Sequence, residues 1–156
     1  MTPNNAEPPV FGQHNGYDIY PMPMFARLEA ENLAETVAWY REALGFGAMF
    51  EMPMLVHLRR QKYQDILVMP GRAAAITDAG LTLSFAADGE VDALFEQASK
   101  AQTRGRSSVE APALMPWNAR EMRLTDPDGR RLVFHERAND PEASARMRAM
   151  FEKQGS

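Results

Sequence analysis

The sequence lacks cysteine, long apolar runs and any excess of basic charge. Without cysteine there is no disulfide framework, no thiolate metal site and no thiol nucleophile. No apolar run approaches the roughly 18 residues that a membrane span needs. The net charge of −4 and the pI near 5.4 give no electrostatic basis for binding nucleic acid or an anionic membrane. The chain does not open with a basic stretch and an apolar run, so we expect a cytoplasmic protein.

The composition is that of a globular protein, with 45% hydrophobic and 24% charged residues among 156. This length fits one domain or two small halves that share a core. Methionine is abundant, with 11 copies. Thioethers are flexible and polarizable, so a methionine cluster in the first half favours an adaptable apolar pocket, although each one alone is explained by core filling. The clustered methionines are Met22, Met24, Met49, Met52, Met54 and Met69.

The first half of the chain predicts one helix between strands. The stretch "NLAETVAWYREALGF" places apolar residues at helical spacing. Asn32 suits its N-cap with Glu35 as the capping-box partner, and Gly45 suits its left-handed end. A strand within "DIYPMPMFARLEA" precedes the helix, and "AMFEMP", "LVHLRRQ" and "YQDILVMP" read as strands after it.

The second half repeats this order. "LTLSFAA" is a strand, and "DGEVDALFEQASKAQTRG" is a helix with Asp88 as its cap and Gly105 at its end. The weak strand "SSVEAP" follows, and then "AREMRLTD" and "RRLVFHE" flank a type I turn at Asp126-Pro127-Asp128-Gly129. We therefore predict an α+β fold of two repeated βαβββ modules that form a cupped mixed sheet. The predicted segments are an N-terminal arm at 1–17, modules at 18–70 and 81–137, a linker at 71–80, and a helical tail at 138–156.

Two phrases, "NLAETVAWYREALGF" and "PWNAREMRLTDPDGRRLVF", together resemble the vicinal oxygen chelate superfamily over about residues 20–137. That family includes glyoxalase I, extradiol dioxygenases, fosfomycin-resistance enzymes and bleomycin-resistance binding proteins. The resemblance implies two modules whose sheets curl into a cleft, often completed in a dimer.

The resemblance also implies four places for metal ligands, and this sequence fills none of them with a donor. The places fall on or near Phe25, Leu67, Thr82 and Val133. A divalent metal needs convergent imidazole or carboxylate groups. The chain therefore resembles the metal-free, ligand-sequestering branch, and we expect no metal and no cofactor. A metal site built from His57 and His135 across the cleft is a minor alternative, and His14 lies in the predicted arm.

Strand alternation predicts which side chains face the cleft. If Val133 faces it, so do Arg131 and His135. In the first half, the same alternation predicts that Arg59 faces the cleft together with His57. We single out Trp117 because its ring needs apolar cover and its N–H needs a partner at a strand entry, whereas Trp39 reads as helix packing. No catalytic residue is assigned. The predicted ligand-binding residues are Phe25, His57, Asp65, Met69, Trp117, Glu121, Arg123 and Val133.

The resemblance implies reversible binding and sequestration of a small, partly aromatic, antibiotic-like molecule. An alternative is a metal-free isomerase, lyase or cyclase that uses Glu121 or His57 as acid or base. A third is an interaction protein with an empty cleft. No phosphate-binding glycine loop, nucleophile elbow or His-Glu-x-x-His motif is present. We also predict a homodimer, with Met147, Met150 and Phe151 as an apolar stripe on the tail helix.

Overall fold

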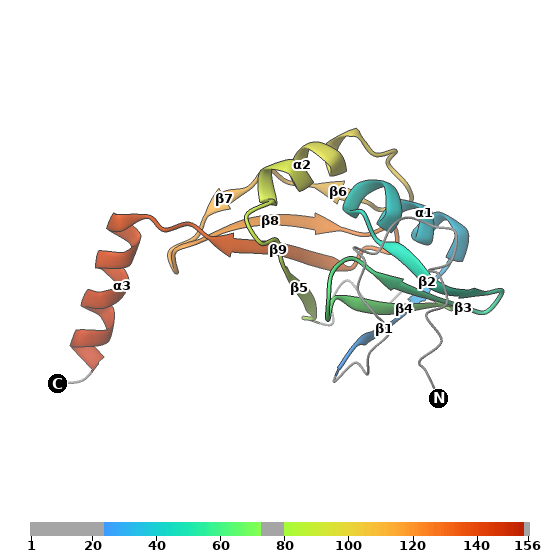
Figure 1. Cartoon of the computed structure of the whole chain (residues 1–156), viewed down its shortest axis with the longest axis horizontal. Coiled ribbons are helices and arrows are strands. Elements are labelled where there is room, and N and C mark those ends of the chain that lie inside the picture. Colours follow the sequence, from blue (N-terminus) through green and yellow to red (C-terminus); the bar gives the residue numbers. More distant parts are fainter. Residues whose placement is uncertain (1–23, 73–79, 155–156) are drawn as a thin grey trace, which may run out of the picture.

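The computed structural model describes residues 24–72 and 80–154 (Figure 1). The first half contains β1 (Ala26–Ala30), α1 (Leu33–Leu44), β2 (Gly47–Met52), β3 (Leu55–Arg59) and β4 (Asp65–Pro70). The second half contains β5 (Thr82–Ala86), α2 (Val91–Lys100), β6 (Ser108–Val109), β7 (Ala113–Leu114), β8 (Ala119–Thr125) and β9 (Arg131–Arg137). Helix α3 (Pro141–Gln154) follows. The predicted arm, the start of the first module and most of the linker lie outside the described residues.

The two sheets share one plan. In the first sheet the strand order is β1-β4-β3-β2, with β1 parallel to β4. In the second it is β5-β9-β8-β6, with β5 parallel to β9 and β7 also paired to β8. Both sheets are mixed, because the remaining pairings are antiparallel. The predicted α+β fold class is confirmed.

Helix α1 begins and ends where the sequence predicts. The Asn32 side chain accepts a hydrogen bond from the Glu35 backbone N–H (3.1 Å), and Gly45 adopts a left-handed φ of 71°. The Glu35 carboxylate does not close a capping box within the helix. It accepts instead from Arg104 at 2.7 Å, so it ties α1 to the loop that follows α2.

Both predicted ends of α2 were wrong. Asp88 has a left-handed φ of 52°, and Glu90 occupies the cap position without a side-chain cap bond. The first N–H of the helix, at Val91, donates instead to the Glu136 carboxylate of β9 (3.2 Å). At the other end α2 stops at Lys100, before Gly105. A side chain at Gly105 would collide with the Pro127 carbonyl oxygen, at 2.4 Å from an ideal Cβ, so this glycine permits close backbone approach.

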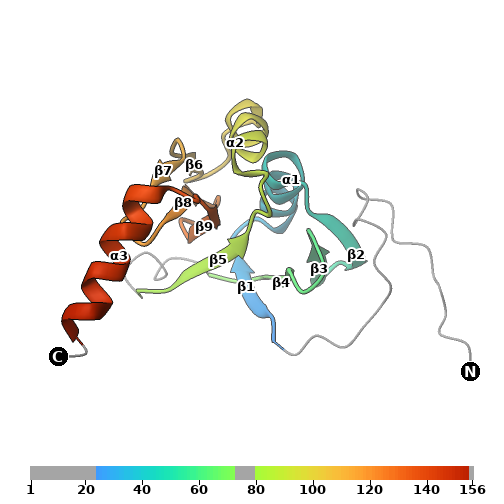
Figure 2. The ribbon, with the colours of Figure 1, turned by 60° about the vertical axis from the view of Figure 1, so that its left-hand side comes forward.

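One hydrophobic core spans both modules. Helices α1 and α2 lie side by side on the same side of the two sheets (Figure 2). Trp39 is buried in the core, as predicted for a packing residue. A chain of ring contacts crosses from one module to the other through Trp39, Tyr40, Phe46, Phe85 and Phe134.

The turn between β8 and β9 is buried against α1. The Tyr40 hydroxyl donates to Asp126, and the Thr36 hydroxyl donates to Asp128, each at 2.8 Å. The backbone N–H of Glu31 also donates to Asp128 (2.9 Å), and Arg130 neutralises Asp126 at 2.7 Å. Burial raises the pKa of the Tyr40 hydroxyl well above its ordinary value, and the charge of Asp126 raises it further. The turn predicted from its four residues therefore also fastens the second module to the first.

The turn between β3 and β4 makes the reverse contact, onto the start of α2. Arg60 donates to the Glu90 carboxylate (3.1 Å), and Gln64 donates to the Ala86 carbonyl (2.9 Å). The Arg60 guanidinium also lies 5.2 Å from the centre of the Phe134 ring. Each module thus places one hairpin turn against the helix of the other or the residues just before it. We call this pair of contacts the reciprocal turns.

Helix α3 confirms the helix predicted in the tail, and it projects away from the second sheet (Figure 1). Phe151 on it is 69% exposed, and Met150 is also exposed. Across residues 24–72 and 80–154, no helix is both long and apolar enough to span a membrane.

Candidate functional site

The second sheet has one face toward the helices and one open face. Met122, Leu124, Leu132 and Phe134 are buried on the helix side. The intervening residues lie on the open face, where Glu121 pairs across the strands with His135, and Arg123 pairs with Val133. The burial pattern follows the predicted alternation. This open face carries three of the residues predicted to bind ligand, Glu121, Arg123 and Val133, and a fourth, Trp117, lies in the turn that leads into β8.

Trp117 lies in the turn between β7 and β8 and is 52% exposed. Its indole N–H donates to the Glu121 carboxylate at 2.8 Å. The Glu121 side chain is largely buried, and its other oxygen lies 3.8 Å from Arg123. Because the N–H is satisfied within the protein, the ring is held in one orientation while half of its surface remains available for contact.

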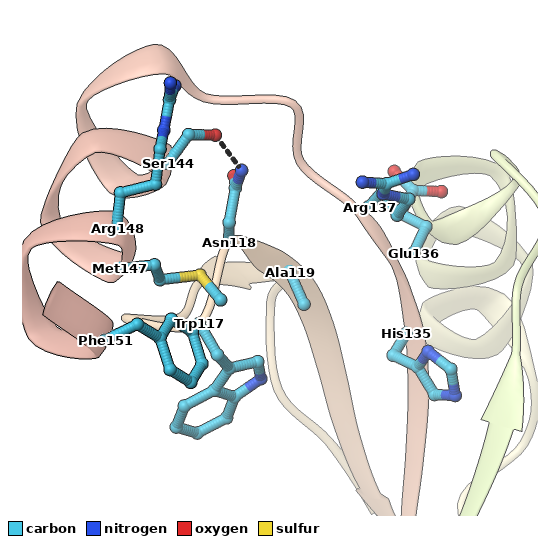
Figure 3. A pocket seen from close by; sticks show the side chains of 10 residues that line it. All are labelled: Trp117, Asn118, Ala119, His135, Glu136, Arg137, Ser144, Met147, Arg148 and Phe151. Carbon is cyan, nitrogen blue, oxygen red and sulfur yellow. Dashed lines mark hydrogen bonds between the residues drawn. The ribbon is translucent and has the colours of Figure 1, made fainter. Parts of the chain in front are cut away.

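A cavity of about 460 Å³ lies between Trp117 and α3 (Figure 3). Met147 and Phe151 of α3 form one wall, and His135 lies on the strand opposite. Asn118 fixes this wall, because its side chain donates to the Ser144 hydroxyl (2.7 Å) and accepts from the backbone N–H of Asp140 (2.9 Å).

A second hollow of about 380 Å³ covers the middle of the same open face. Glu121, Arg123 and Val133 line it together with Thr82 and Arg131. The hydrogen bond between Trp117 and Glu121 joins the two hollows, since Trp117 lines one and Glu121 the other. Sequence reasoning missed the α3 wall. The apolar stripe of α3, from which the sequence predicts a dimer contact, was the available signal.

The first sheet holds a separate polar group on β3 and β4. The Arg59 guanidinium donates to both oxygens of Asp65, at 2.8 and 2.7 Å, and the His57 Nε2 lies 2.6 Å from the same carboxylate. Arg59 and Asp65 are both buried. Burial alone would raise the pKa of Asp65, but the hydrogen bonds from His57 and Arg59 and the arginine charge outweigh it, so this pKa lies below its ordinary value.

This arrangement changes the part that Asp65 can play. Strand parity correctly places Asp65 and Arg59 on the same face as His57. Both Asp65 oxygens are already engaged and buried, so the geometry does not support the predicted direct contact with ligand. Met69 is half-buried farther along β4, and Phe25 precedes β1 in an exposed position.

The predicted site residues therefore form two groups, one on each sheet. Within the described ranges, no hydrogen bond or ion pair joins the His57 group to the Trp117 group. His57 and His135 lie on different sheets and do not pair. His14 lies outside the described residues.

The side chains at the implied metal places do not fit a divalent ion. Leu67 and Val133 are apolar, Thr82 is an exposed hydroxyl residue, and Phe25 precedes the first strand. In the part of the chain that the structure describes, no three or more His, Asp or Glu side chains gather as a metal site would require.

A family model described as "Glyoxalase/Bleomycin resistance protein/Dioxygenase superfamily" matches residues 26–134, which include the first sheet and all of the second except the end of β9. The chain belongs to this superfamily. No match was found among curated proteins.

Solved structures resemble the chain at low sequence identity. A bleomycin resistance determinant encoded on transposon Tn5 is 20% identical, covers 73% of this chain and 96% of its own, and gives a TM-score of 0.60. A bleomycin-binding protein in complex with bleomycin is 21% identical, covers 72% and 96%, and gives 0.59. A lactoylglutathione lyase from Agrobacterium tumefaciens is 20% identical, covers 75% and 95%, and gives 0.55. These similarities establish the fold, which is shared by binding proteins and enzymes.

Proposed function

We propose that this protein reversibly binds a small, partly aromatic molecule on the open face of the second sheet and sequesters it without breaking a bond. The observation that carries the proposal is Trp117, whose ring is half exposed and fixed by Glu121. An aromatic ring at the edge of a hollow gains contact area when a flat ligand covers it. Because the ring is already oriented, little side-chain entropy is lost on binding.

The surroundings of Trp117 suit a ligand with an apolar part and polar substituents. Val133 gives the face an apolar floor, and Met147 adds an adaptable thioether wall. Arg123 and Glu121 supply one charge of each sign for polar groups on the ligand. Two of the structural neighbours are a bleomycin resistance determinant and a bleomycin-binding protein, which agrees with this mode of action.

The alternative is a metal-free isomerase, lyase or cyclase on the same fold. The observation that favours it is the hydrogen-bonded pair of His57 and Asp65, since a carboxylate that orients an imidazole is a common arrangement for proton transfer. A lactoylglutathione lyase is among the structural neighbours.

A thermal-shift screen of natural products tests the proposal, followed by mass spectrometry of each recovered hit. A ligand at 100 times its dissociation constant stabilises the native state by roughly 2.7 kcal/mol, which is readily detected. We expect hits to be recovered chemically unchanged and melting curves to be identical with and without chelator. A hit that is converted to a new product would replace sequestration by the enzymatic alternative. A hit that requires a metal would contradict the metal-free site.

A further inference from the structure

The charge of the buried Asp65 is already balanced without His57. The Arg59 guanidinium donates to both carboxylate oxygens in a bidentate ion pair, which is the strongest geometry for an arginine–carboxylate contact. His57 nevertheless lies only 2.6 Å from one of those oxygens, and its side chain is 26% exposed. The buried pair therefore holds a third, partly accessible group in place.

This contact fixes which nitrogen of His57 is available. An ionised carboxylate only accepts hydrogen bonds, so the His57 Nε2–H must donate to Asp65. When the ring is neutral, this tautomer carries its lone pair on Nδ1. Within the described part of the chain, His57 makes no second hydrogen bond. Its Nδ1 is thus an oriented acceptor for a donor that comes from outside.

The residues directly paired with His57 across the neighbouring strands are apolar. Phe50 of β2 and Leu67 of β4 are its partners across the strands, and directly paired residues share a face. Phe50 is 46% exposed, and Leu67 is half-buried. A flat ring that packs against Phe50 would bring a substituent on its edge to the imidazole.

We infer that the face of the first sheet that carries His57 holds, at the accessible side chains of His57 and Phe50, a subsite for an aromatic hydroxyl compound, whose ring packs on Phe50 and Leu67 and whose O–H donates to the Nδ1 of His57. Asp65 and Arg59 are positioning residues, because they orient His57 and do not touch the ligand. This subsite is separate from the Trp117 surface and is tested on a different signal.

The test compares phenol with anisole, which has the same ring but no hydroxyl proton, on the full-length chain labelled with ¹⁵N. Ring-nitrogen spectra report the His57 Nδ1 directly, and the His135 signal shows whether phenol also enters the Trp117 cavity, which His135 lines. We expect phenol to shift the His57 Nδ1 signal saturably. One hydrogen bond should make phenol bind about 3- to 10-fold more tightly than anisole.

Two variants separate the hydrogen bond from packing. His57→Gln keeps an N–H for Asp65 and a carbonyl acceptor for the ligand, so it should retain the preference for phenol. His57→Phe should bind the two compounds equally, with far-UV circular dichroism as the check on folding. If His57→Phe fails to fold, the subsite is tested by comparing phenol with anisole on the wild type and on His57→Gln.

Three results would overturn the subsite: equal binding of the two compounds by the wild type, no binding of either, or phenol binding with an unshifted Nδ1. None of these affects the Trp117 proposal, whose signal is tryptophan fluorescence with a screened natural product. Conversely, an empty natural-product screen with a positive phenol result would leave the subsite standing alone.

Discussion

At the scale of single residues, hydrogen bonds hold an exposed aromatic ring in place at Trp117 and stabilise a buried charge at Asp65. The Trp117 N–H is satisfied so that its ring can remain half exposed. The Asp65 carboxylate is satisfied so that it can remain charged while buried. An unpaired charge at such a position would cost several kcal/mol.

Replacing Trp117 by alanine separates binding from stability. We expect Trp117→Ala to weaken binding of a screened ligand by about 1–3 kcal/mol, the usual cost of losing an aromatic anchor. The melting temperature should hardly change, because exposed substitutions typically alter stability by less than about 0.5 kcal/mol. Calorimetric titration measures the first effect, and Trp117→Phe should give an intermediate loss. A large drop in melting temperature with unchanged affinity would assign Trp117 to packing.

The lowered pKa of Asp65 predicts a specific loss of stability in acid. The carboxyl group titrates near pH 4 in the unfolded chain and at a lower pH in the folded one. Its contribution is therefore complete above about pH 4 and is lost as the pH falls through the folded-state value. Urea unfolding from pH 6 down to pH 2 should show this loss, and Asp65→Asn should flatten the curve. An identical acid dependence in the variant would show that other carboxyl groups dominate.

The alternation of side chains along a strand predicted the face on which each residue lies, but not how deeply it is buried. Alternation correctly placed His57, Asp65 and Arg59 on one face of the first sheet. Parity says which way a side chain points, but burial depends on what covers that face. The closed pair of Arg59 and Asp65 was therefore beyond the sequence.

At the scale of elements, the reciprocal turns are the most informative feature. The residues Asp126-Pro127-Asp128-Gly129 predicted a type I turn, and the Gly129 N–H does donate to the Asp126 carbonyl at 2.9 Å. The docking of that turn on α1 was not predictable from local chemistry, because Tyr40 and Asp126 are 86 residues apart. Long sequence separation also explains the wrong prediction for the start of α2. The first N–H of that helix is capped by the carboxylate of Glu136 on β9, and not by the nearby Asp88.

Removing one hydroxyl measures how strongly the turn fastens the modules. Tyr40→Phe deletes the buried bond to Asp126 and should lower the free energy of unfolding by about 1.5–3 kcal/mol, the range for hydrogen bonds to charged groups. Urea denaturation gives the value. Ser108→Ala is a matched control, because it removes an exposed hydroxyl contact with Thr125 and should cost less than about 0.5 kcal/mol. Equal losses of unfolding free energy in the two variants would mean that the buried turn stabilises the protein no more than an exposed hydroxyl contact does.

At the scale of the whole molecule, α3 bears on assembly. Met150 and Phe151 expose large apolar side chains on a helix that projects from the body. The homodimer predicted from the sequence remains a prediction. The apolar stripe of α3 offers it a contact.

Sedimentation across a range of concentrations tests this assembly. We expect the wild type to sediment as a dimer, and the double change Met150→Asp with Phe151→Asp to shift it toward monomer, because two charges would enter an apolar contact. Glu142→Gln on the same helix is the control, since Glu142 is exposed and its replacement adds no charge. A wild-type monomer at every concentration would contradict the prediction.

The reciprocal turns also determine when, during synthesis, the first module can be completed. Tyr40 and Thr36 have left the ribosome long before Asp126 and Asp128, their partners 86 and 92 residues later. At roughly 5–20 residues per second, the Tyr40 hydroxyl waits about 4–17 s for its acceptor. The nascent first module therefore passes this time with an unpaired tyrosine in its core and α1 uncovered along one side. This interval ends when the last strands emerge and the turn between them covers α1.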